Sequence, residues 1–356
     1  MPKKIKCIRV PKRQGEKALV LASKLKVVDK EFETQKDPDF VYIPFISQPQ
    51  EDGLKTLTEE GVSYEICTRS FKERKKPKAS LVELLETELP PHLLASLPHA
   101  VDFVGDIAIM EIPPELEAYK KIIGYAVLKT NKNVRTVLSK AGAVSGTYRL
   151  RELDFIAGEK KTETTHKESG CQYRVDVTKA YFSPRLSYEH NRVASLVKEG
   201  ETVADLFAGI GPFAILIAKT HNNVKVHAID ANPSAFEYLK TNIRLNRVIG
   251  KVHPFLGDAR QVVSEKIVGV ADRVIMNLPE KAIEFVDTAC NAVKTEGGIV
   301  HYYSFVNASN SIETIENRFT EAVEKAGRKV VEVLSSRMIR ETAPYEWQVV
   351  LDVSIR

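Results

Sequence analysis

The sequence predicts an α/β protein whose carboxy-terminal half folds into one mostly parallel, doubly wound sheet, and three observations support this prediction. From about residue 200 onward, short apolar runs alternate with segments of helical periodicity. The first run, 203–206, leads into two closely spaced glycines and then into a helix, as strands of such sheets do. The chain closes with two strand-like segments, 330–338 and 346–355, whose short connection predicts a terminal β-hairpin.

The glycine turn after the first strand predicts a site for a nucleotide cofactor. Asp205 ends the strand, Gly209 and Gly211 follow, and a proline then suits the first position of a helix, where no amide donor is needed. The next strand, 224–229, ends at Asp230, which lies 25 residues after Asp205 and can bind both hydroxyls of a ribose. The ribose of a dinucleotide cofactor could bind Asp230 in the same way. No third glycine follows to pack a helix under a pyrophosphate, so the turn favours S-adenosylmethionine, which carries no phosphate.

Two later strand ends supply polar residues to the same edge of the sheet. The strand 274–276 is the fourth in order and ends at Asn277, with Pro279 shortly after it. Ligands of open α/β sheets sit beyond the carboxyl ends of the strands, so we expect Asn277 to lie where the chemistry occurs. Asp258 can accept a hydrogen bond from an adenine amino group, or it can simply cap the next helix. The alternation is completed by helices over 234–248 and 311–326 and a buried strand over 298–305.

Length and composition set the outer bounds. The 356 residues allow two or three domains with cores of their own, and 43% hydrophobic content is ordinary for a globular protein. No apolar stretch is long enough to cross a bilayer and the amino terminus lacks a signal-peptide core, so we expect a cytoplasmic protein without a membrane partner. The four cysteines form no Cys-x-x-Cys pair, which disfavours a zinc site or a disulfide framework. We expect no bound metal and a monomer.

The positive charge is concentrated at the amino terminus. Residues 1–80 hold 18 Lys or Arg and 12 Asp or Glu, so 18 − 12 gives +6, and the net charge of +5 leaves −1 for the rest of the chain. Cationic surface provides affinity for polyanions such as nucleic acid. The excess ends in a basic stretch that is either such a surface or a solvated linker, and its cations are Arg69, Lys72, Arg74, Lys75, Lys76 and Lys78.

These patterns predict four segments. The first is a small α/β module with a short helix over 18–25 and a strand over 40–45. A second unit has helices over 81–88 and 119–131 and an apolar run over 107–110. The expected boundaries are 1–70 for the module, 71–79 for a basic linker, 80–169 for the middle domain and 170–356 for the cofactor domain.

One segment joins the middle and cofactor domains, and it reads Tyr181-Phe182-Ser183-Pro184-Arg185-Leu186, followed by Glu189. Together with the 205–213 turn and Asn277-Leu278-Pro279, it resembles the archaeal and eukaryotic tRNA (guanine-N1)-methyltransferase family, which modifies position 37 beside the anticodon. The resemblance covers nearly the whole chain. It implies a Rossmann-like class I methyltransferase domain with a seven-stranded sheet, an RNA-binding middle domain, and a small α/β amino-terminal domain that touches the outer corner of the tRNA.

The resemblance also implies how guanine N1 is methylated. That nitrogen carries a proton at neutral pH, so a general base is needed. Glu189 matches the family's catalytic glutamate, and an exposed helix-start glutamate stabilised by the helix dipole is the alternative. Arg149 matches the arginine that stabilises charge on O6, with Arg151 as a rival because both lie on one face of a strand. Tyr181 matches the tyrosine that packs on the flipped base, unless it is a core residue, and Arg185 is expected to bind substrate. The catalytic set is completed by Asn277 and Pro279.

Cofactor roles follow from the same resemblance. Asp230 is expected to bind the ribose diol, and Asp258 with Ala259 to bind the adenine. His190 matches a family position that adjoins the cofactor, although a lone histidine is more often structural. The expected cofactor-binding residues are His190, Asp205, Phe207, Gly209, Gly211, Asp230, Ala231, Asp258, Ala259 and Asn277.

Glu280 occupies the place of the aromatic residue in the Asp/Asn-Pro-Pro-aromatic tetrad of methyltransferases that act on exocyclic amines. A glutamate cannot stack on a base, so ring-nitrogen chemistry supported by Tyr181 is favoured. The family's wyosine-pathway relatives carry an aromatic residue after the proline, so Glu280 favours a monofunctional enzyme over a bifunctional or wyosine-pathway one. A protein or small-molecule methyltransferase and a catalytically silent RNA-binding protein are further alternatives.

Overall fold

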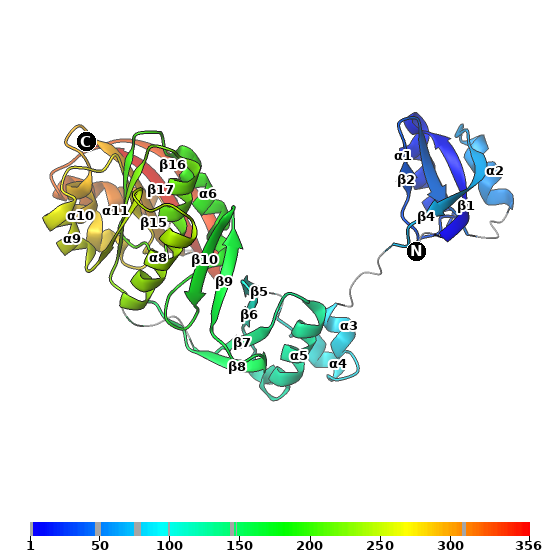
Figure 1. Cartoon of the computed structure of the whole chain (residues 1–356), viewed down its shortest axis with the longest axis horizontal. Coiled ribbons are helices and arrows are strands. Elements are labelled where there is room, and N and C mark those ends of the chain that lie inside the picture. Colours follow the sequence, from blue (N-terminus) through cyan, green and yellow to red (C-terminus); the bar gives the residue numbers. More distant parts are fainter. Residues whose placement is uncertain are drawn as a thin grey trace. The chain divides into compact units, whose positions relative to one another are not determined.

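The computed structural model describes residues 3–46, 51–74, 80–98, 100–142, 146, 148–307 and 311–356. The chain forms two compact units, Met1–Ala79 and Ser80–Arg356 (Figure 1). Within the basic stretch, Lys75, Lys76 and Lys78 lie outside the described residues. None of the described helices has both the length and the apolar character needed to cross a membrane.

The first unit is a four-stranded antiparallel sheet in the order β2-β3-β1-β4, packed against two helices. Its core brings Ala18 and Leu57 of the helices onto Ile8 and Ile43 of the sheet. The first helix begins at Gly15, three residues before the expected start, where a Cβ atom would come within 2.6 Å of the Val41 side chain. The elements are β1 (Lys3–Pro11), α1 (Gly15–Lys24), β2 (Gln35–Lys36), β3 (Phe40–Pro44), α2 (Glu51–Glu59) and β4 (Glu65–Phe71).

The second unit begins with a four-stranded sheet in the order β5-β6-β7-β8, in which only β6 and β7 run parallel. A capping box between Ser80 and Glu83 starts its first helix, which ends at Leu85 rather than at the expected residue 88. The elements are α3 (Leu81–Leu85), α4 (Pro91–Leu94), β5 (Val101–Val104), β6 (Ile107–Met110), the 3₁₀ helix η2 (Pro114–Tyr119), α5 (Lys120–Thr130), β7 (Thr136–Lys140) and β8 (Leu153–Gly158).

A hairpin of β9 (Glu163–Glu168) and β10 (Cys171–Asp176) links this sheet to the carboxy-terminal sheet. Two asparagines of the following domain bond its backbone: Asn242 Oδ1 accepts from Arg174 N at 2.7 Å, and Asn246 Oδ1 accepts from Gln172 N at 2.9 Å. The expected boundary after residue 169 therefore falls inside one hairpin.

The expected seven-stranded sheet is confirmed, in the order β13-β12-β11-β14-β15-β17-β16, with only β17 antiparallel to its neighbours. Helices α6 to α8 contribute to the core on one face and α9 to α11 to the core on the other. The last hairpin is longer than expected, since β16 pairs with β17 as far as Ala343 across four register shifts. The elements are η3 (Pro184–Leu186), α6 (Ser187–Leu196), β11 (Thr202–Asp205), α7 (Pro212–Thr220), β12 (Lys225–Asp230), α8 (Pro233–Leu245), β13 (Val252–Leu256), α9 (Ala259–Lys266), β14 (Arg273–Met276), η4 (Ala282–Phe285), α10 (Val286–Ala292), β15 (Gly298–Asn307), α11 (Ile312–Lys325), β16 (Val330–Ala343) and β17 (Glu346–Ile355).

Candidate active site

A cavity of about 270 Å³ lies at the carboxyl ends of β11, β12 and β14, and we call it the strand-end cavity. These three strands are neighbours in the sheet, which brings residues from far apart in the sequence into one wall. Its lining includes seven of the expected cofactor residues, namely Phe207, Gly209, Asp230, Ala231, Asp258, Ala259 and Asn277.

The glycine turn shapes this cavity through its backbone. Gly211 has a φ of 96° at the start of α7, and a Cβ atom there would come within 2.6 Å of Leu239 Cδ1. It lies outside the cavity lining and supports the turn from behind. The N–H of Gly209 donates to Asp230 Oδ2 at 2.6 Å, and the nearest atom to a Cβ added at Gly209 lies 3.6 Å away, so this glycine leaves room for a ligand.

Two buried carboxylates stand at the ends of β11 and β12. Asp205 is fully buried, its Oδ1 accepts a 3.4 Å bond from Phe207 N, and its Oδ2 has no partner. Burial, with a smaller contribution from Asp230, raises the pKa of Asp205 to about 7. Burial also raises the pKa of Asp230, against the hydrogen bonds from Asn232 and Gly209. Asp205, although expected to bind the cofactor, lines none of the three cavities, whereas Asp230 and Gly209 line the strand-end cavity. A buried acid beside an open glycine fits S-adenosylmethionine, which offers a ribose diol and an ammonium group.

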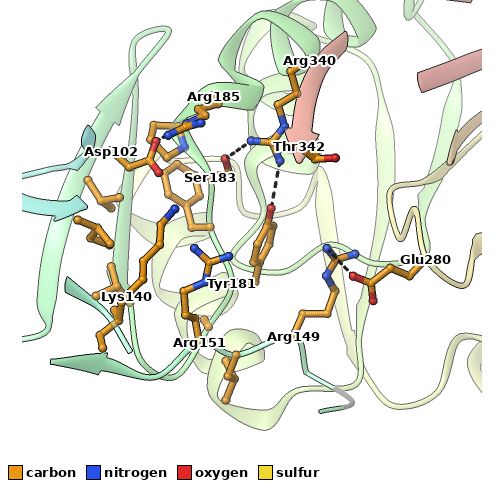
Figure 2. Close-up of a pocket in the computed structure, with 18 of the residues that line it drawn as sticks. Asp102, Lys140, Arg149, Arg151, Tyr181, Ser183, Arg185, Glu280, Arg340 and Thr342 are labelled. Atoms are coloured by element: carbon orange, nitrogen blue, oxygen red, sulfur yellow. Dashed lines mark hydrogen bonds and ion pairs between the residues drawn. The ribbon is translucent and has the colours of Figure 1, made fainter. Parts of the chain in front are cut away.

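A larger cavity of about 380 Å³ lies between β5 to β8 and the sheet domain, and we call it the cationic cavity (Figure 2). Five cations line it: Lys140, Arg149, Arg151, Arg185 and Arg340. A third cavity of about 60 Å³ bridges the other two and is lined by His190, Phe213, Asn277, Pro279 and Gln348, among others. Arg149 and Tyr181 line all three cavities, so both lie at the junction.

Arg149 and Arg151 point in different directions, which corrects the expectation that both lie on one face of a strand. Arg149 adopts a φ of 55° in a turn, so the strand alternation does not apply. Its guanidinium lies 3.3 Å from Glu280 and 5.3 Å from the centre of the Tyr181 ring (Figure 2). Arg151 reaches only the cationic cavity. The Nε atoms of both arginines are buried without a partner.

Comparison with known proteins identifies the family of the chain. Residues 164–333 match the TRM5/TYW2 methyltransferase domain, 81–162 the TYW2 N-terminal domain and 7–53 the tRNA methyltransferase 5 N-terminal domain. The chain is 38% identical to tRNA (guanine(37)-N(1))-methyltransferase Trm5b of Pyrococcus abyssi and 35% identical to that of Methanocaldococcus jannaschii, in each case over 98% of both chains. The chain belongs to the TRM5/TYW2 methyltransferase family.

Solved structures of the family share the whole architecture. The crystal structure of Trm5b from Pyrococcus abyssi matches with a TM-score of 0.74 at 37% identity, over 99% of both chains. A complex of aTrm5 with tRNALeu matches with a TM-score of 0.71 at 33% identity, over 98% of this chain and 99% of that one. The family resemblance seen in the sequence is thereby confirmed. The family also contains tRNA 4-demethylwyosine(37)-methyltransferase Taw21 of Saccharolobus solfataricus, 37% identical over 71% of this chain and 92% of its own.

The residue that matches the family's glutamate, Glu189, lies behind the cavities. It sits in the first turn of α6 as expected, but it is 1% exposed and lines none of the three cavities. Its carboxylate accepts from Arg192 Nη2 at 3.0 Å and from the Tyr303 hydroxyl at 3.1 Å, and it pairs with Arg337. The alternative of an exposed helix-start glutamate is therefore wrong.

His190 is held by structural contacts and also lines a cavity. Its Nδ1 lies 2.7 Å from Glu168 Oε1 and its ring packs edge-on to Phe213, which is a structural arrangement. The same ring lines the bridging cavity. Burial opposes ionisation of Glu168, but the hydrogen bond with His190 and the nearby His166, whose Nε2 lies 3.7 Å from Oε2, outweigh it and lower the pKa of Glu168 to about 2.

Several site residues were missed by the sequence reasoning. Gln348 Nε2 donates to Asn277 Oδ1 at 3.3 Å, and Arg340 donates to Ser183 Oγ at 3.2 Å. Both come from the last hairpin, whose alternating pattern predicts strands and gives no sign of which side chains reach the site. Arg185, expected to bind substrate, lines the cationic cavity and pairs with Asp102. Over the described part of the chain, no three side chains cluster as metal ligands.

Proposed function

We propose that this protein is a tRNA (guanine-N1)-methyltransferase that transfers the methyl group of S-adenosylmethionine to N1 of guanosine 37. The observation that carries the proposal is the junction of the strand-end and cationic cavities at Arg149 and Tyr181. A methyl donor bound in the strand-end cavity would lie next to a base that a polyanion places in the cationic cavity. The identity to Trm5b of Pyrococcus abyssi over almost the full chain supports the same reaction.

S-adenosylmethionine supplies the methyl group as an electrophile bonded to a sulfonium. In the proposed complex Asp230 binds the ribose hydroxyls, Asp258 and Ala259 bind the adenine, and the glycine turn with Phe207 lines the methionine moiety. Asn277 and Pro279 line the bridging cavity and orient the reacting groups there.

The flipped guanine rests on Tyr181, and Arg149 donates to O6 as negative charge develops there. The Arg149 guanidinium is already held beside the Tyr181 ring and Glu280, so little reorganisation precedes the reaction. Fixed donors aimed at developing charge stabilise a transition state more than mobile ones do.

We assign removal of the N1 proton to Glu189. As the N1–methyl bond forms, the bond between the methyl carbon and sulfur breaks, the sulfonium leaves as a neutral thioether, and the N1 proton passes to the carboxylate. Of the three donors on that carboxylate, Tyr303 is fully buried and Arg192 is anchored on Asp352, whereas the Arg337 side chain is 30% exposed. We infer that Arg337 gives way when the base arrives and opens one carboxylate oxygen toward the site.

The test is methyl transfer from labelled S-adenosylmethionine to unmodified tRNA transcripts that carry guanosine or adenosine at position 37, with the product nucleoside identified by mass spectrometry. We expect 1-methylguanosine from the guanosine transcript alone. Label in neither transcript contradicts the proposal and directs attention to a 4-demethylwyosine tRNA as substrate, as the name of the Saccharolobus relative suggests.

We further propose that the amino-terminal unit binds the outer corner of the tRNA, because the chain's excess of positive charge lies in residues 1–80. A chain of residues 80–356 should keep its calorimetric S-adenosylmethionine affinity within about two-fold while losing discrimination between folded tRNA and an isolated anticodon stem-loop. Equal discrimination by both chains contradicts this role. We also propose a cytoplasmic monomer, which light scattering and cell fractionation test.

A further inference from the structure

The five cations of the cationic cavity are not equivalent, because carboxylates neutralise three of them. Arg185 pairs with Asp102, Arg149 lies 3.3 Å from Glu280, and Lys140 lies 3.5 Å from Glu111. Arg151 and Arg340 have no ion-pair partner among the described residues, and the other two carboxylates of the lining, Glu341 and Glu346, pair with neither of them.

Neither of the two unneutralised arginines has its charge balanced by its hydrogen bonds. Arg151 makes no side-chain hydrogen bond in the described part of the chain, and its Nε is buried without a partner. Each guanidinium nitrogen of Arg340 has a partner, but all three partners are neutral: Nε donates to Gln348 Oε1 at 3.1 Å, Nη1 to Ser183 Oγ at 3.2 Å and Nη2 to the Tyr181 hydroxyl at 3.5 Å. A cation without a counter-ion beside a cavity is unfavourable unless an anionic ligand completes it.

The two side chains approach the cavity from different walls. Arg151 precedes β8 of the middle sheet, Arg340 belongs to β16 of the large sheet, and Tyr181 lies between them (Figure 2). A nucleotide whose base packs on Tyr181 brings one phosphodiester on its 5′ side and one on its 3′ side. Guanidinium groups bind phosphate oxygens with two parallel hydrogen bonds, which suits such a pair of anions.

We propose that Arg151 and Arg340 bind the two phosphodiesters that flank the methylated nucleotide, one arginine on each side. This inference rests on the proposed function for its choice of RNA as the ligand. It moves the substrate-binding role from Arg185, which is already neutralised, to two residues with free charge. It also gives Arg151 and Arg149 different roles, because Arg151 binds the RNA backbone and Arg149 donates to the base.

The test is the salt dependence of tRNA binding by the full chain, measured by filter binding. We expect Arg151→Met and Arg340→Met each to weaken binding by about 5- to 30-fold and to reduce the slope of log K against log salt by about 1. Arg151→Lys and Arg340→Lys keep the charge and should keep the slope, which a purely structural role would not predict. Arg135→Met, at a 66% exposed arginine paired with surface acids, is the matched control. Unchanged calorimetric binding of S-adenosylmethionine shows that each variant is folded.

Single methylphosphonate linkages in the tRNA then locate each contact. A neutral linkage on the 5′ or 3′ side of nucleotide 37 should weaken wild-type binding and have no further effect in the one variant that lacks its partner arginine. Either of two results overturns the inference. One is a slope of log K against log salt for Arg151→Met and Arg340→Met that equals the slope for Arg135→Met. The other is a neutral linkage that weakens binding by both variants as much as it weakens binding by the wild type. Binding is measured without methyl transfer, so a wild-type chain that transfers no methyl group overturns the proposed function and leaves this result intact.

Discussion

Two groups of charged side chains in the second unit differ in how completely they are bonded. Behind the cavities, Arg192 pairs with Asp352, whose Oδ1 lies 2.5 Å from His301 Nδ1, and His301 Nε2 lies 2.8 Å from Arg273. In the second group, Arg149 Nε and Arg151 Nε at the cavity linings, and Asp205 Oδ2 at the end of β11, are buried without a partner. The first group is bonded within the protein. In the second, the two arginines have donors left for molecules that enter the cavities.

The difference separates stability from function. Buried polar networks whose members are all bonded fix the fold, whereas incompletely bonded sites weaken it and are retained where a ligand completes them. Substitutions in the bonded group should therefore lower the free energy of unfolding, and substitutions in the other group should mainly lower ligand binding or rate.

The largest stability effect is expected for Asp352→Asn. The change removes the anion shared by Arg192 and His301, and breaking a buried ion pair costs about 3–5 kcal/mol. Urea unfolding near neutral pH measures this loss of stability, with Asp154→Asn at an exposed side chain as control.

The effect of Asp352→Asn should also depend on pH. Burial opposes ionisation of Asp352, but the bonds from His301 and Arg192 hold its pKa below the usual range. Its stabilisation is therefore present above about pH 4 and lost at lower pH, so the two proteins should converge in acid. A constant difference contradicts this.

A smaller effect of opposite pH dependence is expected for Asp205→Asn. Burial raises the pKa of Asp205 from 3.8 to about 7, so its contribution to the stability of the cofactor-free fold is full below about pH 4 and is lost as the pH rises through about 7. The asparagine side chain cannot ionise, so the free energy of unfolding of the variant should rise relative to that of the wild type by up to about 4 kcal/mol between these two pH values. Thermal unfolding at a series of pH values measures the gain. A difference independent of pH would mean that the carboxylate has a partner.

The smallest stability effect is expected for Arg149→Met. Its ion pair with the half-exposed Glu280 is of a kind worth less than about 1 kcal/mol, and its buried Nε makes no bond to lose. The single-turnover rate of methyl transfer should nevertheless fall about 100-fold, because the donor for O6 is gone. A large loss of stability with little loss of rate would place Arg149 among the bonded structural group.

The cofactor side of the site is predictable from the sequence because its residues follow strand ends. Asp230 and Asn277 lie 47 positions apart in the sequence (277 − 230 = 47), yet parallel strands bring every such end to one edge. The surroundings of Glu189 are not predictable in this way. Its partners Tyr303 and Arg337 lie more than 100 positions away, and only the register of β15, β16 and β17 places them beside α6.

Local backbone geometry explains why Arg149 and Arg151 were wrongly expected on one face of a strand. The alternation of side chains holds only for extended residues, and the sequence does not show that Arg149, a non-glycine residue, adopts a positive φ. The roles assigned to individual site residues stay predictions.

The most direct test of the account is the single-turnover rate of methyl transfer by Glu189→Gln on tRNA with guanosine 37, compared with wild type and with Glu117→Gln at an exposed surface pair. The account predicts that the rate falls at least about 100-fold while tRNA and S-adenosylmethionine still bind, because the amide cannot accept the N1 proton. A variant that is less stable but transfers methyl at nearly the wild-type rate would make Glu189 a structural member of the buried network and place the base elsewhere.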